Sequence, residues 1–488
     1  QLREARALLR DAALHQTQGS YGYEGLGAPC LAKNGTCLAN SAMRDTLLVG
    51  VAIGRFIGEP LDLVMGLASF PARLCIGLLT CALVSAQGPG PMNILVITLD
   101  DVGIDRFPGY GVHPVEPRMP TMERLMAGGL TFERVWAMPS CSPSRASLLT
   151  GRFPARHGVY KQIAPGDPNQ PHLDPAERTL PRVLQGYRSA VVGKWHLRAA
   201  GNPTTHPQDC GFGHHLGSMF NISAVTGYWN WRKWIDGTSV TEPGYATSVT
   251  VDDTLRQVQH LPDPWFIYMN FNAAHSPFHT PPANLHTQGQ PSTDRERYRA
   301  MLEAMDTEIG RLLEGLDLDN LLLIIIGDNG TPQSIVDGPW SSFHGKGSLF
   351  EGGVRVPLIV HGPGVTQGRS LALVCITDIH ATLAELTGGF SGAEDSVSFA
   401  DVLIDPDSLG QRRYLFAERG KDGVTPGGRL RAISDGRWKL MDTGPLVRFY
   451  DLQGDIAENH NLRTPNGPLD PEARAAYVRL REALVGFP

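Results

Sequence analysis

The stretch Leu321-Leu-Leu-Ile-Ile-Ile326 is followed at once by Gly327-Asp328-Asn329-Gly330. It is an unbroken aliphatic run of strand length, and its second half is β-branched. A strand with no polar face is buried on both sides, as in a parallel sheet that carries helices on both faces. The run therefore predicts a central strand of an α/β domain, with Asp328 and Asn329 at its carboxyl end.

Three other segments show the same pattern, in which an apolar run stops at polar residues. Residues 93–99 end in Asp100-Asp101, residues 190–192 end in Gly193-Lys194-Trp195-His196, and residues 265–271 lead to His275. Helical patterns lie between these runs at residues 119–126, 179–184 and 295–316. This alternation predicts a large, mostly parallel sheet flanked by helices. Because ligands bind beyond the carboxyl ends of such strands, we expect the polar residues to gather in one site.

Asp100, Asp101, Asp328 and Asn329 form a set of oxygen ligands at two of these strand ends. Oxygen donors without His or Cys favour Ca²⁺ or Mg²⁺ over zinc. Taken singly, an Asp-Asp pair is as readily a helix N-cap, and Asp-Asn-Gly is as readily a turn. Since both pairs end apolar strands, we expect one divalent cation between them.

A further segment reads Cys141-Ser-Pro-Ser-Arg-Ala-Ser-Leu-Leu-Thr-Gly-Arg152. Pro143 suits the entry to a helix, whose free N–H groups favour a nearby anion. Arg145 adds a permanent positive charge. A lone cysteine is usually a buried packing residue, so the surrounding pattern has to argue for chemistry at Cys141.

That segment resembles the signature of the type I sulfatases of the alkaline phosphatase superfamily, in which the cysteine is oxidised after translation to Cα-formylglycine. The resemblance covers about residues 92–463 and includes Gly193-Lys-Trp-His196, Ala273-Ala-His-Ser-Pro-Phe278 and His344-Gly-Lys-Gly347 with Glu351-Gly-Gly-Val-Arg-Val-Pro357. It implies an arylsulfatase-like sulfuric ester hydrolase that cleaves sulfate monoesters to an alcohol and sulfate.

The resemblance also implies a role for each site residue. One calcium ion, with magnesium as the alternative, would be bound by Asp100, Asp101, Asp328, Asn329 and the formylglycine from Cys141. The formylglycine hydrate would be held and activated by Arg145 and His196. The sulfate would be held by Lys194, His275 and Lys346, of which His275 and Lys346 would also assist the departing alcohol. One hydroxyl of the hydrate would attack sulfur, and the second, deprotonated by His196, would expel sulfate. Ser218 is a further candidate without an assigned role.

The implied partners are a sulfated small molecule or carbohydrate and a formylglycine-generating maturation enzyme. Aromatic residues of the segment 201–250, among them Tyr228, Trp229, Trp231 and Trp234, suit stacking on a sugar or aryl ring, although packing is the stronger explanation for most of them. Two alternatives stay open. One is hydrolysis of phosphate or phosphonate esters, and the other is a non-catalytic relative that keeps only the fold.

The C-terminal part of the chain changes character. Residues 412–418, 430–441 and 446–452 read as short strands joined by turns at Asp435-Gly436 and Thr443-Gly-Pro445. With a helix over residues 471–485, they predict a smaller antiparallel sheet plus a helix. We therefore predict a catalytic domain at 87–390 and a C-terminal subdomain at 391–488.

Residues 65–86 carry the pattern of a secretory signal peptide, with Arg73, an apolar run at 74–84 and Ser85-Ala86. The run is short for a membrane span, and a buried helix is the alternative. We predict that residues 1–64 are an extension outside the mature protein, and that the protein is secreted or periplasmic, or lysosomal on a eukaryotic secretory route.

Composition limits the remaining possibilities. The 488 residues carry a net charge of −6 without a long basic block, which argues against a nucleic-acid partner. Hydrophobic residues make up 42% and charged residues 19%, as is usual for a globular protein. Cys141, Cys210 and Cys375 are too widely spaced for a disulfide framework.

Overall fold

The computed structural model describes residues 91–420, 428–463 and 468–488. The predicted signal peptide at 65–86 and the extension at 1–64 lie outside the described residues. The described chain belongs to a single contact unit, Gln87–Pro488. The proposed boundary at residue 390 stays a prediction.

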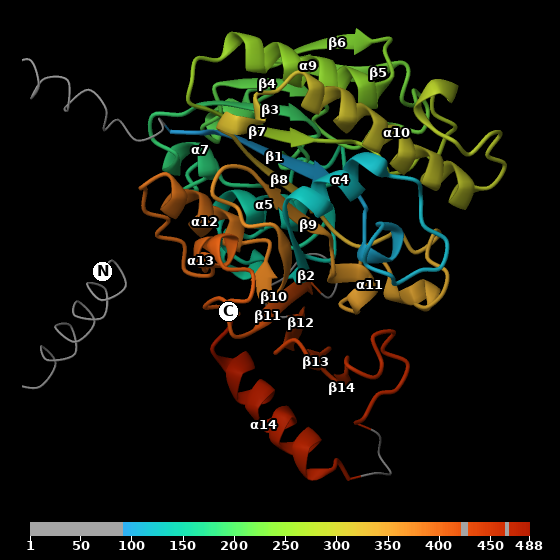
Figure 1. Ribbon diagram of the computed structural model, residues 1–488, viewed down its shortest axis with the longest axis vertical. Coiled ribbons are helices and arrows are strands. Elements are labelled where there is room, and N and C mark those ends of the chain that lie inside the picture. Colours follow the sequence, from blue (N-terminus) through green and yellow to red (C-terminus); the bar gives the residue numbers. More distant parts are fainter. Residues whose placement is uncertain (1–90, 421–427, 464–467) are drawn as a thin grey trace, which may run out of the picture. The chain divides into compact units, whose positions relative to one another are not determined.

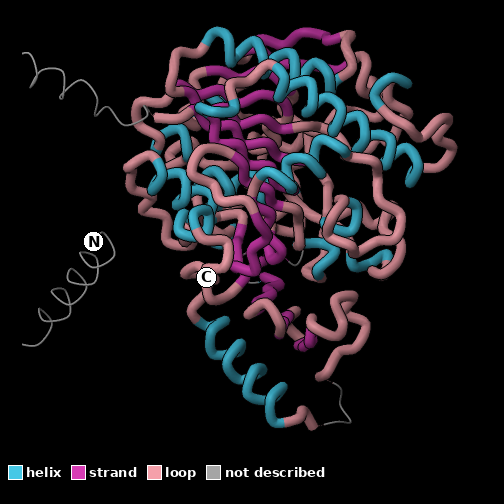
Figure 2. The backbone as a smooth tube through the Cα atoms, viewed as in Figure 1, coloured by secondary structure: helices cyan, strands magenta, loops and turns pink. Residues whose placement is uncertain are grey.

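A ten-stranded sheet runs through this unit in the order β10-β2-β9-β8-β1-β7-β3-β4-β5-β6 (Figure 2). The four predicted strands are neighbours at its centre, and they run parallel: β8 (Leu321–Gly327), β1 (Asn93–Leu99), β7 (Trp265–Asn270) and β3 (Arg188–Gly193). They are almost wholly buried, which confirms the prediction made from their apolar runs.

Six further strands extend the sheet on both sides: β10 (Gly368–Cys375), β2 (Leu130–Trp136), β9 (Leu358–His361), β4 (His214–Gly217), β5 (Trp231–Ile235) and β6 (Thr238–Glu242). Strands β9 and β5 run antiparallel to both of their neighbours. The sheet is therefore mixed but mostly parallel, as expected.

Helices cover both faces of the sheet (Figure 1). One layer holds α4 (Pro120–Gly128), α9 (Ala246–His260) and α10 (Asp294–Glu314), and the other holds α5 (Cys141–Thr150), α7 (Leu180–Val183), α12 (Asp378–Leu386) and α13 (Ala400–Ile404). Successive residues of β1 serve the two layers in turn: Ile94 and Val96 pack in one core, whereas Leu95 and Ile97 pack in the other. Burial on both faces explains why β1 needs a continuous apolar run.

The C-terminal part forms a four-stranded antiparallel sheet of β11 (Leu415–Gly420), β12 (Arg429–Ser434), β13 (Trp438–Asp442) and β14 (Val447–Asp451). Helix α14 (Pro471–Val485) packs on β13, and its N-cap Asp470 accepts a hydrogen bond from the Ala473 N–H. Both the smaller sheet and its helix were predicted, and the structure confirms them.

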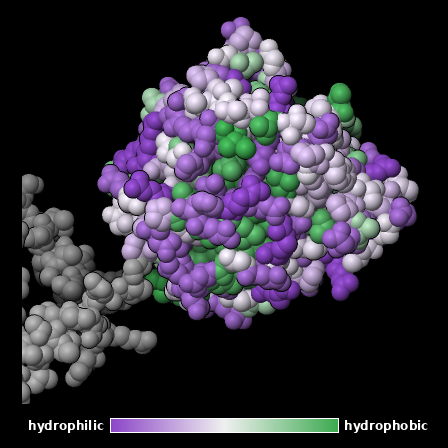
Figure 3. Space-filling view, turned by 90° about the horizontal axis from the view of Figure 1, so that it is seen from above, coloured by the Kyte–Doolittle hydropathy of each residue, from purple (hydrophilic) through white to green (hydrophobic). Residues whose placement is uncertain are grey.

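Short elements connect these layers: α6 (Pro154–His157), α8 (His206–Asp209), α11 (Glu351–Val354) and 3₁₀ turns at Ile104–Arg106, Ala283–Leu285, Leu318–Asn320 and Ser342–His344. Within the described residues, no helix has both the length and the apolar character needed to cross a membrane. Green hydrophobic areas on the face seen in Figure 3 are divided by purple hydrophilic ones. The three cysteines Cys141, Cys210 and Cys375 are all free and buried.

Candidate active site

The carboxyl ends of β1 and β8 bring the predicted acidic residues together. Asp100 and Asp101 directly follow β1, and Asp328 directly follows β8. The Asp101 N–H donates to Asp328 Oδ1 at 3.0 Å. The Ala274 N–H, beyond β7, donates to the Asp100 carbonyl at 2.9 Å. The first hydrogen bond therefore fixes the Asp328 carboxylate, and the second fixes the backbone at Asp100.

Two residues of the site hold a left-handed backbone that side chains other than glycine rarely adopt. Asp101 has φ 63° and His196 has φ 57°. Gly193, the last residue of β3, has φ 90°, and a Cβ there would lie 1.9 Å from the Asn270 carbonyl oxygen. The bend that directs Lys194 and His196 into the site therefore depends on glycine at 193.

The oxygen atoms of this cluster suit a divalent cation. One ligand atom each from Asp100, Cys141 and Asp328 lies within 4.8 Å of the others. Asp100 Oδ1 and Asn329 Oδ1 are buried without a hydrogen-bond partner. The orientation of the Asn329 amide is fixed because its Nδ2 donates to Asp101 Oδ1 and to the Gly330 carbonyl, both at 2.9 Å. Two buried oxygens are thus left free for a cation, and hard oxygen donors fit Ca²⁺ or Mg²⁺.

The pKa values of the two carboxyl groups that follow β1 are shifted in opposite directions. Burial and the neighbouring charges of Asp328 and Asp101 raise the pKa of Asp100, although Lys194 opposes them. Burial acts on Asp101 as well, but Lys346 and His275 hold its pKa below the usual range. Its carboxylate is turned toward Lys346, whose Nζ lies 2.5 Å from Asp101 Oδ1. The ligand roles of all five residues, Asp100, Asp101, Cys141, Asp328 and Asn329, stay predictions.

Cys141 is the first residue of α5, and Ser140 is its N-cap. The small hydroxyl residues of the segment anchor this helix end. Ser144 Oγ lies 3.0 Å from the Met138 N–H and 3.1 Å from the Met138 carbonyl oxygen, and Ser142 Oγ accepts from the Ile163 N–H at 3.1 Å. Burial raises the pKa of the Cys141 thiol, so the unmodified cysteine is protonated and a poor nucleophile.

His196 faces Cys141 with an unprotonated nitrogen. Its Nε2 lies 2.8 Å from the Ile163 carbonyl, which can only accept, so Nε2 carries the hydrogen. Its Nδ1 lies 3.3 Å from Cys141 Sγ. Burial and the charge of Lys194 hold the pKa of His196 well below its ordinary value. The imidazole is therefore neutral, and its free lone pair points at residue 141.

Three cations face the three carboxylates, and of these Arg145 and Lys194 are buried and Lys346 is partly exposed. Arg145 donates from Nε at 3.1 Å and Nη2 at 2.8 Å to Asp328 Oδ2. Its Nη1 donates to the Lys194 carbonyl at 3.0 Å. Lys194 Nζ pairs with Asp100, as Lys346 pairs with Asp101. The site is electrically balanced, so a bound cation would leave it with a net positive charge.

His275 completes the predicted set at the rim of the site. Its Nε2 lies 3.9 Å from Asp101 Oδ2, and its Nδ1 donates to the Ser276 carbonyl at 2.7 Å. Burial, with Lys346, lowers the pKa of His275 to about 3. Tyr228 supports this segment, because its hydroxyl lies 2.7 Å from the His275 carbonyl oxygen. Sequence reasoning treated Tyr228 only as a stacking or packing residue.

The loop that carries Lys346 is held from the C-terminal sheet. Lys439 of β13 lies 2.9 Å from both Glu351 Oε1 and Glu458 Oε1, and all three side chains are buried. The Lys346 N–H donates to the Thr331 carbonyl at 2.8 Å. A residue almost a hundred positions later in the chain thus helps to place a cation of the site.

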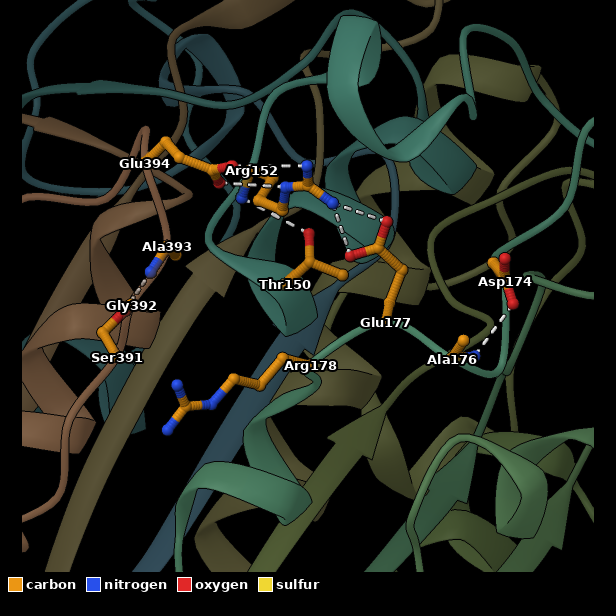
Figure 4. Close-up of a pocket in the computed structure, with 10 residues that line it drawn as sticks. All are labelled: Thr150, Arg152, Asp174, Ala176, Glu177, Arg178, Ser391, Gly392, Ala393 and Glu394. Carbon is orange, nitrogen blue, oxygen red and sulfur yellow. Dashed lines mark hydrogen bonds and ion pairs between the residues drawn. The ribbon is translucent and has the colours of Figure 1, made fainter. Parts of the chain in front are cut away.

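The distal half of the cysteine signature has a structural role. Arg152 pairs with Glu177 at 2.8 Å and with Glu394 at 3.0 Å in a polar crevice (Figure 4). Helix α5 rises about 1.5 Å per residue, so Thr150 at this crevice lies roughly 14 Å from Cys141. Because of this separation, the crevice is distinct from the site at the other end of α5.

All ten predicted site residues thus meet at the carboxyl ends of the central strands, with Cys141 and Arg145 supplied by α5 and Lys346 by the loop before α11. Such a set of cations and acids suits the hydrolysis of an anionic ester. A family model described as Sulfatase matches residues 92–389. N-acetylgalactosamine-6-sulfatase of Homo sapiens is 34% identical over 383 residues, which cover 69% of this chain and 70% of that protein.

Arylsulfatase A of Bos taurus is 28% identical over 472 residues, covering 82% of this chain and 89% of that protein. The solved structure of Ps i-CgsB in complex with k-i-k-neocarrahexaose has a TM-score of 0.68 at 24% identity, and the match covers 80% of this chain and 92% of that one. The chain belongs to the sulfatase family. It is a sulfuric ester hydrolase.

Proposed function

We propose that this sulfatase cleaves sulfate monoesters with a Cα-formylglycine formed from Cys141 and with one divalent cation, calcium in the first place. The observation that carries the proposal is the unprotonated His196 Nδ1, which lies 3.3 Å from Cys141 Sγ. A neutral imidazole in this position can accept a proton from the group that residue 141 carries. It is useful beside a hydroxyl that must lose a proton.

Formylglycine would supply, as its hydrate, two geminal hydroxyls, one to attack sulfur and one to expel sulfate. The chain's own residues prepare that chemistry. The N-terminal end of α5 presents residue 141 to the strand ends, where free N–H groups favour an anion. His196 accepts a proton at Nδ1 while the Ile163 carbonyl fixes its ring. Arg145 holds the position of Asp328, beside residue 141.

A divalent cation would be held by Asp100, Asp328 and residue 141, with Asn329 Oδ1 and Asp101 as further ligands; it would polarise the sulfuryl oxygens. The three carboxylates are balanced by three cationic side chains, so the bound ion adds the positive charge that attracts a sulfate ester. Lys194 and Lys346 then lie ready to bind the sulfuryl oxygens.

Lys346 and His275 would act on the departing alcohol. Asp101 raises the pKa of Lys346 against the effect of burial, so this side chain stays charged and stabilises the leaving oxygen electrostatically. His275 Nε2 is unprotonated at neutral pH because burial and Lys346 lower the pKa of this imidazole. A bound anion would favour its protonated form, and Nε2 would then donate to the leaving oxygen.

The residues 65–86 and the sulfatase membership together support a secretory destination. We propose that the protein meets its maturation enzyme on that route and acts outside the cytoplasm on a sulfated small molecule or carbohydrate. Sequencing the amino terminus of the protein from its native host would test this, since a start after residue 86 is expected.

The decisive experiment joins modification to activity. The protein would be produced with a formylglycine-generating enzyme, and the tryptic peptide of residues 135–145 would be weighed. We expect loss of H₂S and gain of one oxygen, together with hydrolysis of an aryl sulfate that Cys141→Ala abolishes. Full activity with an unmodified Cys141 would refute the formylglycine. A preference for aryl phosphate or phosphonate over aryl sulfate would refute the substrate class.

A further inference from the structure

A cavity of about 450 Å³ lies beside the active site, between the segment that follows β3 and strand β5. Its walls carry two arginines and three aromatic residues. They include Arg198, Ser218, Phe220, Trp231, Arg232 and Trp234. None of the catalytic roles above uses these side chains.

The cavity shares a wall with the residue 141 pocket. The backbone that carries Ser218 and Met219 accepts hydrogen bonds from the Trp195 N–H at 2.8 Å and the His196 N–H at 3.1 Å. The ring of Phe220 lies edge-on to the His196 ring, with 6.5 Å between centroids. A substrate whose sulfate reaches residue 141 can therefore place its alcohol part in this cavity.

Among the residues that the structure describes, Arg198 is a buried charge without a counter-ion. Its residue is 7% exposed, and its guanidinium donates only to the carbonyls of Ala200 and Asn202. Its Nε has no partner, and no carboxylate of the described residues forms an ion pair with it. Burial of an unpaired charge is costly, so an anion in the cavity would be strongly favoured there.

Arg232 presents a second unpaired guanidinium to the same cavity. It is exposed on β5, and within the described part of the chain it has no carboxylate partner. Its Cζ lies 5.8 Å from the centre of the Trp234 ring, and Arg198 Cζ lies 5.7 Å from the Phe220 ring. The contrast with Arg152 is direct, because that arginine is neutralised by Glu177 and Glu394.

We propose that this cavity is the subsite for the alcohol part of the substrate, and that it selects a sugar carrying a second anionic group besides the sulfate that is cleaved. The proposal rests on the sulfatase function proposed above. Aromatic faces pack against the apolar faces of a sugar ring, and guanidinium groups bind carboxylate and sulfate oxygens in pairs. The shared chemistry is an anionic saccharide, with either a uronate or a second sulfate as the charged group.

The test compares three substrates on the formylglycine-bearing enzyme: a sugar with a single sulfate, the same sugar with a second sulfate, and a disaccharide that adds a uronate to the single sulfate. Wild type should prefer one of the doubly charged substrates in kcat/KM. Arg198→Gln and Arg232→Gln should each reduce that preference about 10- to 100-fold, mostly through KM. The doubly charged substrate for which the variants lose the wild-type advantage in kcat/KM identifies the charged group as a second sulfate or a uronate.

Arg481→Gln is the matched control, because Arg481 is also exposed and its Cζ lies 5.9 Å from the Tyr477 ring, on α14. It should leave the preference unchanged. If Arg198→Gln fails to fold because Arg198 is buried, Arg232→Gln still tests the proposal, since Arg232 lies on the surface. A second readout avoids turnover altogether: if the uronate is the charged group, an unsulfated uronate disaccharide should bind wild type in calorimetry and bind both variants more weakly. If the second sulfate is the charged group, this disaccharide should bind wild type and both variants equally weakly.

Two outcomes separate this inference from the proposed function. If aryl sulfate is hydrolysed but the second charge gives no preference that either arginine controls, the subsite proposal is overturned and the sulfatase function stands. If the converted enzyme hydrolyses none of the sulfate monoesters, the proposed function fails, and the subsite proposal fails with it.

Discussion

Arg145 donates two hydrogen bonds to a single oxygen of Asp328, from Nε at 3.1 Å and from Nη2 at 2.8 Å to Oδ2. The contact joins helix α5, which carries residue 141, to the end of β8, which carries the acid. The position of the proposed cation and the position of the nucleophile are therefore set by one side chain.

Replacing Arg145 with lysine should weaken calcium binding by about 10- to 100-fold, because a single ammonium cannot hold Asp328 from two nitrogens. Calcium titrations followed by thermal unfolding would measure the shift in half-saturation. Arg152→Lys, which changes the other arginine of the signature, serves as the control. Equal calcium affinities for the Arg145 variant and wild type would contradict the prediction.

Replacing Cys141 with serine should trap the enzyme. The single hydroxyl that Cys141→Ser introduces can attack sulfur and release the alcohol, but no second hydroxyl on the same carbon is there to expel sulfate. We expect roughly one turnover per enzyme and a stable sulfate ester on residue 141, visible by mass spectrometry. Cys141→Ala should carry no added sulfate. Steady turnover by the serine variant would exclude an elimination step.

Replacing His196 with glutamine should lower kcat by about 10²- to 10⁴-fold, since the base at Nδ1 is lost while a polar side chain remains. Formylglycine content and bound calcium would be measured in the same preparation, so that a loss of either is not mistaken for a loss of the base. His172→Gln changes a histidine outside the site and should keep wild-type kcat. A kcat within a few-fold of wild type for His196→Gln would remove this residue from the mechanism.

Replacing Lys439 with methionine should destabilise the fold by about 3 to 5 kcal/mol, because Glu351 and Glu458 would remain buried without their cation. Urea unfolding would measure the loss. Adding Glu351→Gln and Glu458→Gln to this variant should recover part of it.

The residue that precedes β13 offers the control for Lys439. Arg437, the residue before β13, pairs with Asp451 and Glu472 at the surface, and Arg437→Met should destabilise the fold far less than Lys439→Met. Similar losses for the two single variants would show that burial does not set the strength of the Lys439 contacts.

His157 should make stability fall in acid. Burial, with Arg152, lowers its pKa from 6.5 to about 3 in the folded protein. Below pH 6.5 the unfolded chain therefore binds a proton that the folded chain rejects, and stability is lost as the pH falls through that window. Between pH 7 and pH 5 the loss is about 2 kcal/mol.

Urea unfolding of His157→Gln at these two pH values should show a difference smaller by about that amount. His460→Gln changes a histidine that is largely exposed and should keep the wild-type difference. An unchanged pH dependence in His157→Gln would show that this imidazole accepts a proton in the folded protein.

The sequence predicted the centre of the sheet because β1, β3, β7 and β8 are buried on both faces and must be apolar throughout. Strand β2 was not predicted, because the charged residues Glu133 and Arg134 interrupt its apolar pattern. Both side chains are half-buried in the folded chain. Strand β9 has only four residues. Their places depend on pairing with distant segments, which no local pattern records.

The site residues were predictable because parallel strands end at a common edge and because the cysteine segment resembles a known family. The partner that orients His196 was not, since a backbone carbonyl such as that of Ile163 has no signature in sequence. Arg198 gave no signal either. Its importance comes from burial without a counter-ion, which only the folded chain reveals.

The burial of Cys141 has a consequence for how the active protein is made. Every residue of α5 from Cys141 to Thr150 is buried, so an oxidising enzyme cannot bind this segment of the folded chain. The proposed conversion would therefore take place while the nascent chain is still extended, before α5 forms and before Lys346, some two hundred residues later, joins the site. The fraction of active enzyme would then depend on the rate of modification relative to the rate of folding. A chain that folds faster would contain more unconverted cysteine.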